Sequence, residues 1–476
     1  MKYAALISLL IAFFLPATGC MKAGADYTRP DTEFTVPEQF ENTVRTGAYA
    51  ADDKWWAAFN DPFLDDMVER VVSGNHDIRQ AASRVMEARA LLEQVDADRY
   101  PQAGAAANAS RMRQPFVNPF TDQADAYEAK QFSLSVPASF EIDLWGRLAR
   151  ASEAGRAEMM AAEFNRRTVI HSVIAESVTR YLETRSLEAR IDITEKMAET
   201  ARIHLELVEN RHERGLAPVI EVHQARRTLA QIQSRLPALR QAAGLSKQAL
   251  SIMEGEYPES ADRIQHPVYA FSIPDPVPEG LPSELLNRRP DILAAEARLE
   301  AASARIGQAK AARFPRLSLT GAFGYSSDSL KSFFTSQNEI WNIAAEAAVP
   351  LYDAGRLKAG QRAAEAQFEA QTVAYARVIL IAFGEVEGAL LTRQQQIERR
   401  DYLAVYLEEA KTTEMTAADR YYRGLIDYSV VLEAIQSRYQ AEMELVETES
   451  AIYANRVRLH RALGGGWDHV LTVSHP

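Results

Sequence analysis

The chain carries the same turn sequence twice, and no other feature restricts its possible folds as strongly. RHERGLAPVIEVHQA begins at Arg211, and RYYRGLIDYSVVLEA begins at Arg420. Two longer related segments begin at Asp77 and Asp291, and a third pair, DLWGRL and DAGRL, precedes two stretches rich in Ala, Arg and Glu. Because the three pairs follow in the same order, the pattern indicates one structural unit used twice.

Each copy of the unit has the same predicted order of elements. A helix ends at an aromatic residue followed by Pro101 or Pro315, because proline cannot continue it. Two strand-like runs follow, then a very long helix, the Arg-Gly-Leu turn and a returning helix. The sequence has no proline between Gly146 and Asn210, which permits a helix of about 100 Å.

Four runs are the predicted strands, of which three alternate between apolar and polar residues and one, AGAAANASRMRQ, alternates only weakly. The third and fourth runs place Leu319 and Ile343 on one face and Glu346 on the other, because successive side chains of a strand point to opposite sides. The lengths suit strands that cross a membrane, which need ~9–11 residues. The predicted strands cover about residues 103–114, 130–143, 316–329 and 340–353.

Four membrane strands are not stable alone, because unpaired backbone groups at open edges cost several kcal/mol each in hydrocarbon. Two copies provide eight strands, whose bore is filled by side chains, whereas three copies provide twelve and leave a lumen. We therefore predict a trimer, in which the long helices continue the barrel wall as a hollow cylinder.

The N-terminal sequence MKYAALISLLIAFFLPATGC predicts export. Its apolar run is shorter than the ~20 residues of a membrane-spanning helix, so it is typical of a signal peptide. Small residues precede Cys20, as in a bacterial lipoprotein cleavage site, although Ala17 stands where Leu is commoner. We expect Cys20 to carry lipid. Met21 follows it where an Asp would indicate retention in the inner membrane, so the outer membrane is favoured. An ordinary signal peptide is the alternative. Cys20 is the only cysteine, so an internal disulfide is excluded.

Composition and motifs argue against nucleic acid and against catalysis. The formal charge is −12, with no basic stripe for a phosphate backbone. The nine histidines show neither H-E-x-x-H nor a zinc-ligand spacing, so surface or packing roles are favoured. The glycines from Gly464 to Gly466 follow a helix and lack the Lys-Ser/Thr of a phosphate loop, which favours helix termination. We expect no enzyme activity, no metal and no cofactor other than the lipid.

The repeats and the proline-rich stretch divide the chain. We predict a signal peptide, a lipidated tether, a first repeat, a connector that contributes an equatorial segment, a second repeat and a tail, at residues 1–19, 20–54, 55–253, 254–290, 291–463 and 464–476.

Several stretches give the chain a family resemblance: DYTRP, WWAAFNDPFLDDMV, FEIDLWGRL, GLPSELLNRRPDI, VPLYDAGRL and ALGGGWD. The chain resembles the TolC-like outer-membrane factor family, in the lipoprotein branch that serves resistance-nodulation-division (RND) efflux pumps. The resemblance implies a mixed α and β fold: a trimeric 12-stranded outer-membrane barrel, a periplasmic α-helical barrel and an equatorial domain. It also implies docking to a periplasmic adaptor and an inner-membrane RND transporter, and passage of small molecules outward.

The resemblance also assigns roles to residues around the two turns. It implies that the turns contact the adaptor and close the periplasmic mouth. It places Glu433 at the aperture, with Ser429 one turn earlier, and makes Glu221 and Tyr421 a latch. Ile426 departs from relatives that carry a bridging arginine there. The adaptor-contacting residues are Gly215, Leu216, Gly424 and Leu425.

Other interpretations remain open from the sequence alone. The turns can be helix caps without a partner, and Glu433 can be a solvated helix residue. The whole chain can be a lipid-anchored periplasmic coiled-coil scaffold without a pore, since its helices have a similar composition. A conduit of the same family that exports proteins is a further alternative.

Overall fold

The computed structural model describes residues 22–31, 34–42, 54–117, 124–259, 277–278, 280 and 282–465. The chain forms two compact units, each built from segments of both repeats: unit 1 contains residues 84–163 and 294–375, and unit 2 contains residues 164–293 and 376–476, each with part of the N-terminal region. Cys20 and Gly466 lie outside the described residues.

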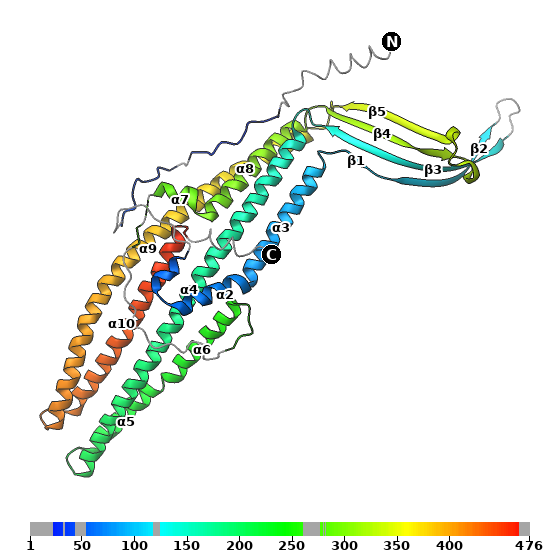
Figure 1. Ribbon diagram of the computed structural model, residues 1–476. Helices are drawn as coiled ribbons and strands as arrows, with labels where there is room; N and C mark the ends of the chain where they lie inside the picture. Colours follow the sequence, from blue (N-terminus) through cyan, green and yellow to red (C-terminus); the bar gives the residue numbers. More distant parts are fainter. Residues whose placement is uncertain are drawn as a thin grey trace. The chain divides into compact units, whose positions relative to one another are not determined.

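Helices make up most of the described chain (Figure 1). They are η1 (Trp55–Phe59), α2 (Pro62–Gly74), α3 (His76–Ala97), α4 (Arg147–Glu213), α5 (Val219–Gln233), α6 (Leu236–Met253), α7 (Pro282–Arg288), α8 (Pro290–Ala311), η2 (Leu330–Ser332), η3 (Ser336–Asn338), α9 (Arg356–Tyr422) and α10 (Tyr428–Ala462). None of these described helices combines the length and the low polarity of a helical membrane span.

Matching lengths confirm the internal repeat. Helices α3 and α8 have 22 residues each, and α4 and α9 have 67 residues each. The returning helix differs between the copies. It is continuous in α10, but in the first copy it stops at Gln233 and resumes as α6, so our expectation of a single returning helix is wrong there. The cause is Pro237, which lacks an N–H and clashes with the preceding turn.

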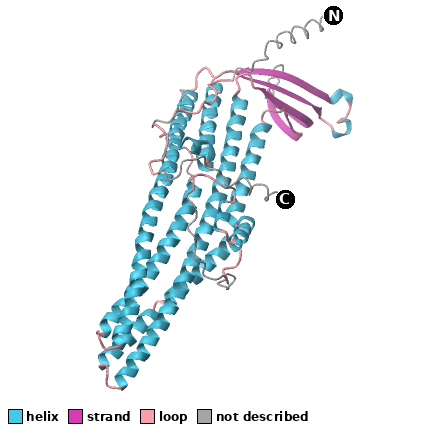
Figure 2. Ribbon diagram, turned by 60° about the vertical axis from the view of Figure 1, so that its left-hand side comes forward, coloured by secondary structure: helices cyan, strands magenta, loops and turns pink. Residues whose placement is uncertain are grey.

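The strands form one antiparallel sheet, which Figure 2 shows in magenta. They are β1 (Gln102–Ala103), β2 (Ala106–Val117), β3 (Ala124–Ile142), β4 (Arg316–Ser327) and β5 (Glu339–Ala348). Both β1 and β2 pair with β3, so they occupy the place of one interrupted strand, and β4 and β5 follow. Within the described protomer the outer edges of β2 and β5 therefore have no partner strand.

The four predicted strands are present, with different ends. The first is divided, and β3 begins earlier than expected because its hairpin with β2 extends to the pair Val117 and Ala124. The last strand ends at Ala348 instead of residue 353. Pro350 lies two residues later, and proline has no N–H to donate to a neighbouring strand.

The register places the apolar residues of β3, β4 and β5 on one face. Phe140 is opposite Leu319, Leu319 is opposite Ala345, and Gly321 is opposite Ile343. Directly opposite residues of an antiparallel pair point to the same side, so Leu319 and Ile343 share a face, as predicted. The other face carries mainly small and polar residues: Ser133, Ser135, Ser139, Glu141, Ser318, Thr320, Ser326, Asn342 and Glu346.

Two aspartates connect the sheet to the long helices. The carboxylate of Asp143 accepts a hydrogen bond from the backbone N–H of Ala149 over 2.7 Å, and that of Asp353 accepts one from Leu357 over 2.9 Å. A carboxylate at this position satisfies N–H groups that lack a partner within the helix. The repeated DLWGRL and DAGRL sequences are therefore strand-to-helix connections.

Candidate functional site

The two repeated turns have the same backbone geometry. In the first, the N–H of Leu216 donates to the carbonyl of Arg211 over 2.8 Å, and Gly215 has a φ of 72°. In the second, Leu425 donates to Arg420 over 2.9 Å, and the turn glycine has a φ of 75°. This bonding is that of a Schellman helix end, which requires the left-handed conformation that glycine adopts readily. Both turns lie in unit 2.

The leucine after each glycine is exposed. Leu216 is 64% exposed and Leu425 is 68% exposed. Val219 and Ile220 continue the apolar surface of the first turn, because they are more than half exposed. Isolated exposed leucines are ordinary, but a contiguous exposed apolar group is typical of a contact surface. The turns therefore offer apolar side chains that the protomer itself does not cover.

Tyr421 and Glu221 are brought together from the ends of α9 and α5. The phenol of Tyr421 donates a hydrogen bond to Glu221 Oε2 over 2.5 Å, and the Tyr421 side chain is 3% exposed. Burial, together with the adjacent Glu221 carboxylate, raises the pKa of Tyr421, so the phenol remains a donor at neutral pH. The two residues are thus hydrogen-bonded within the protomer, and their role as a latch stays a prediction.

Arg211 and Tyr428 complete this contact, although no sequence pattern singles out either residue. The guanidinium of Arg211 lies 4.8 Å from the centre of the Tyr421 ring and donates to the carbonyl of Tyr422 over 3.0 Å. Tyr428 packs against Tyr421 with ring centroids 5.1 Å apart. Burial raises the pKa of Tyr428 to about 12. The first turn therefore holds the second through both a carboxylate and a cation.

Glu433 lies on the exposed face of α10. Tyr428, Val431 and Leu432 on the opposite side are buried, whereas Ser429 and Glu433 are exposed. Residues four apart are neighbours on a helix surface, so Ser429 and Glu433 lie on one side of α10, and their place at an aperture stays a prediction. No hydrogen bond or ion pair of the Glu433 carboxylate is found among the described residues, which leaves this group open to solvent or to another chain.

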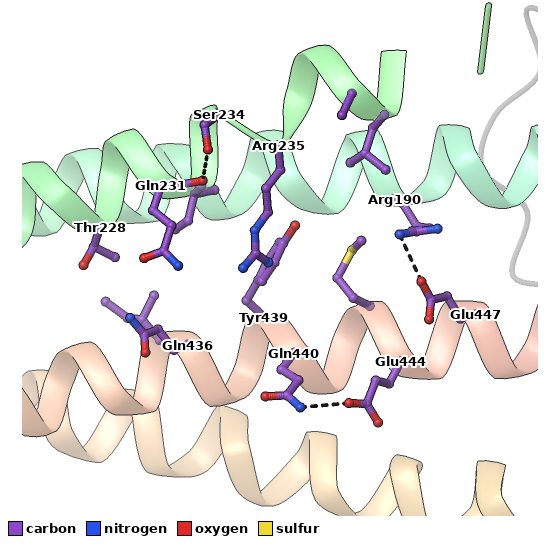
Figure 3. A pocket seen from close by; sticks show the side chains of 15 residues that line it. Arg190, Thr228, Gln231, Ser234, Arg235, Gln436, Tyr439, Gln440, Glu444 and Glu447 are labelled. Atoms are coloured by element: carbon purple, nitrogen blue, oxygen red, sulfur yellow. Dashed lines mark hydrogen bonds and ion pairs between the residues drawn. The ribbon is translucent and has the colours of Figure 1, made fainter. Parts of the chain in front are cut away.

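A cavity of about 640 Å³ lies near the break between α5 and α6 (Figure 3). It is lined from α4, α5, α6 and α10. The Arg235 guanidinium lies 4.8 Å from the centre of the Tyr439 ring, and Arg190 forms a 3.0 Å ion pair with Glu447. The Thr228 hydroxyl is buried without a hydrogen-bond partner among the described residues. The break in the first returning helix thus leaves loose packing opposite α10.

Three of the described histidines, His171, His460 and His212, have packing or capping roles. Burial lowers the pKa of His171 to about 4 and that of His460 to about 3, so both rings are neutral at pH 7. Trp55 stacks on His460 with centroids 5.1 Å apart. His212 Nδ1 lies 2.8 Å from the carbonyl oxygen of Ala217 within the first turn. These positions agree with the packing interpretation drawn from the sequence.

Comparison with known proteins identifies the family. The family model described as "Outer membrane efflux protein" matches residues 67–256 and 281–465. The cation efflux system protein CusC of Escherichia coli O6:H1 is 32% identical over 460 residues, covering 95% of this chain and 97% of CusC. The pyoverdine export outer membrane protein OpmQ of Pseudomonas putida is also 32% identical, over 458 residues, with the same shares covered.

A solved structure agrees with this assignment. The outer-membrane channel OprN superposes with a TM-score of 0.85 at 30% identity, covering 94% of this chain and 99% of OprN. The relatives of this chain are outer-membrane efflux channels and not enzymes, and OprN shares its fold. The chain belongs to the outer membrane efflux protein family.

Proposed function

We propose that three copies of this chain form a 12-stranded barrel and serve as the outer-membrane duct of a tripartite efflux system. The observation that carries the proposal is the sheet, which has one apolar face and two edges without partner strands in the described protomer. Such edges are not tolerated in lipid, and pairing β2 of one copy with β5 of the next removes them. Three copies are the smallest number whose barrel leaves a lumen.

The surface of α9 supports packing between copies. Leu380, Leu391 and Tyr402 are each at least half exposed. They recur at an interval close to three helical turns, which keeps them on one side of the helix. A stripe of this kind on a long helix is suited to contact with another long helix. The second copy of the chain supplies such a helix.

The remaining partners of the proposed system are a periplasmic adaptor and an inner-membrane RND transporter. The exposed Leu216 and Leu425, which follow Gly215 and Gly424, are suited to contact helical hairpins of an adaptor. The substrates are small molecules. Their identity is left open because the named relatives differ, CusC in cation efflux and OpmQ in pyoverdine export. The fold and family do not support the scaffold without a pore, whereas protein export stays a second candidate.

Cys20 is proposed to carry lipid that anchors the mature chain in the outer membrane. The support is the cleavage-site sequence before Cys20. Labelled palmitate is expected to enter the wild-type protein and to be lost in Cys20→Ala. Equal labelling of both proteins would show that Cys20 is not the acylated residue. Met21→Ala serves as the control that changes the neighbouring position only.

The channel is tested by conductance in planar bilayers. The closed wild-type trimer is expected to conduct weakly and to prefer cations, because three Glu433 carboxylates line the aperture and rings of carboxylates attract cations. Glu433→Ala is expected to reduce this preference and any block by divalent cations. Glu444→Ala is the control, since it removes a carboxylate farther along α10 that already binds Gln440 over 2.9 Å.

Two outcomes separate the parts of the proposal. A protein that forms no pore in any bilayer contradicts the duct itself. A pore whose ion preference is unchanged in Glu433→Ala shows instead that the aperture lies elsewhere and that Glu433 is a solvated helix residue. A wild-type trimer that is wide open by itself contradicts the closed mouth.

A further inference from the structure

The internal repeat gives each residue of the first turn a counterpart in the second. Arg211 corresponds to Arg420, and both carbonyls accept the hydrogen bond that ends their helix. Tyr421 and Tyr422 of the second turn correspond to His212 and Glu213 of the first. Since the two turns have the same backbone geometry, corresponding side chains start from equivalent places.

Within the protomer, only one of the two arginines has a partner in the other turn. Arg211 reaches from the first turn to the ring of Tyr421 and to the carbonyl of Tyr422. Arg420 is exposed, and no ion pair or hydrogen bond of its guanidinium is found among the described residues. Arg211 of the first turn thus contacts the second turn, whereas its counterpart Arg420 of the second turn makes no equivalent contact with the first turn of the same described protomer.

By the repeat, the counterparts of the Tyr421 ring and the Tyr422 carbonyl are the His212 ring and the Glu213 carbonyl, and the Glu213 side chain adds a carboxylate at that place. Glu213 occupies the position equivalent to Tyr422, is exposed, and has no ion pair or hydrogen bond of its side chain among the described residues. Arg420 and Glu213 therefore carry opposite charges at the two places that the repeat relates. They do not bind each other within the described protomer.

We infer that Arg420 of each copy binds Glu213 of the neighbouring copy. This inference rests on the proposed ring of copies. In a closed ring made by a heterologous interface, every surface used on one side is met by its complement on the next subunit. Within each subunit the first turn contacts the second turn. Across each boundary, the second turn of one subunit then faces the first turn of the next subunit. Arg420 thus takes, between subunits, the place that Arg211 has within one, with the Glu213 carboxylate as its partner instead of a ring and a carbonyl.

The contact gives the mouth alternating links around the ring. The link within a subunit combines a buried tyrosine with Glu221, whereas the link between subunits is an exposed ion pair of Arg420 and Glu213. Exposed pairs are weakened by salt far more than buried ones. The boundaries between subunits are therefore the parts of the closed mouth that respond to ionic strength.

Cross-linking tests the contact directly, because Cys20 is the only cysteine of the natural chain. Membranes containing the double variant Glu213→Cys and Arg420→Cys are treated with a short bismaleimide, which tolerates a longer separation than a disulfide. Covalent dimers and trimers are expected to become the main species. Each single variant is expected to stay monomeric. The matched control is Glu221→Cys with Tyr421→Cys, which is expected to link within one chain and to remain a monomer.

Trapping the wild-type trimer with an amine-reactive reagent separates a failure of the contact from a failure of the trimeric assembly. If that trimer forms and the Glu213 and Arg420 cysteines give no covalent oligomers, the contact is overturned and the channel assembly stands. If no wild-type trimer forms, the proposed assembly itself is wrong.

Charge reversal provides a second measurement that does not depend on cysteine. Glu213→Arg and Arg420→Glu are each expected to raise the conductance of the isolated channel, and the double reversal is expected to return it to the wild-type value. Recovery of this kind is the signature of two interacting residues. Additive effects of the two reversals would overturn the ion pair.

Discussion

The substitution Ile343→Arg is expected to destabilise the membrane-inserted barrel by ~2–4 kcal/mol, which is the cost of a guanidinium on the lipid face near the midplane. Ile343 is 81% exposed in the protomer and is opposite Gly321, which is itself opposite Ala138. These residues lie near the middle of the apolar face, which extends on β3 from Phe132 to Ile142. Leu319→Arg is expected to have the same effect, because Leu319 lies on that face one pair away from Gly321.

The matched control lies on the same strand at the same depth. Ala344 follows Ile343 and is opposite Thr320, so its side chain points to the other face. Ala344→Arg is expected to be tolerated, and so is Glu346→Arg. The measurement is the temperature at which the trimer loses its resistance to unfolding in detergent, compared for all four variants. Equal losses for Ile343→Arg and Ala344→Arg would contradict the assignment of the faces.

The alternation of residues was enough to predict the strands β3, β4 and β5, because each of them has one apolar side. It was not enough to place their ends. On β3 the apolar series stops at Phe132, but the strand continues through Lys130 and Glu128, where Glu128 binds Arg111 of β2 over 2.8 Å. Cross-strand charge pairs extend a hairpin outside the apolar band. A search for apolar alternation does not detect that extension.

The interruption of the first returning helix has a different cause. Pro237 stands where the second copy has Val446, and a proline can either begin a helix or break one. Local sequence does not distinguish these outcomes at Pro237. The repeat would have indicated one continuous helix, and this is where similarity between the copies misleads. The cavity opposite α10 is lined by residues on both sides of that break.

The site was predictable to the extent that the family resemblance supplied it. Glu221 and Tyr421 are 200 positions apart in the chain, and no local pattern pairs them. Arg211 was missed because the repeat contains two equivalent arginines, and only the packing of the turns shows which one has a partner. The exposed position of Glu433 agrees with an aperture residue, but one protomer alone does not bring three carboxylates together.

Removing the link between Tyr421 and Glu221 is expected to open the periplasmic mouth. The variant is Tyr421→Phe with Glu221→Gln, which removes the donor and the charge while conserving volume. A hydrogen bond to a charged group contributes about 1.5–3 kcal/mol, and the trimer contains one in each subunit. If opening breaks all three, their combined loss is comparable with the roughly 5.5 kcal/mol that converts a 1:99 mixture of two states to 99:1. Conductance in planar bilayers should rise from a weak to an open level.

Tyr428→Phe, the loss of a hydroxyl beside Tyr421, provides the control. Tyr428 is buried against Tyr421, and no hydrogen bond of its hydroxyl is found among the described residues. Tyr428→Phe should therefore leave the conductance at the wild-type level, because it removes a hydroxyl without removing a link. An equal rise in Tyr428→Phe would show that general loosening of the turns opens the mouth. No rise in the double variant would show that Tyr421 and Glu221 only stabilise the protomer, and that closure depends on contacts between subunits. An adaptor opens the wild-type mouth only if it binds the dilated form of the turns more tightly than the closed form.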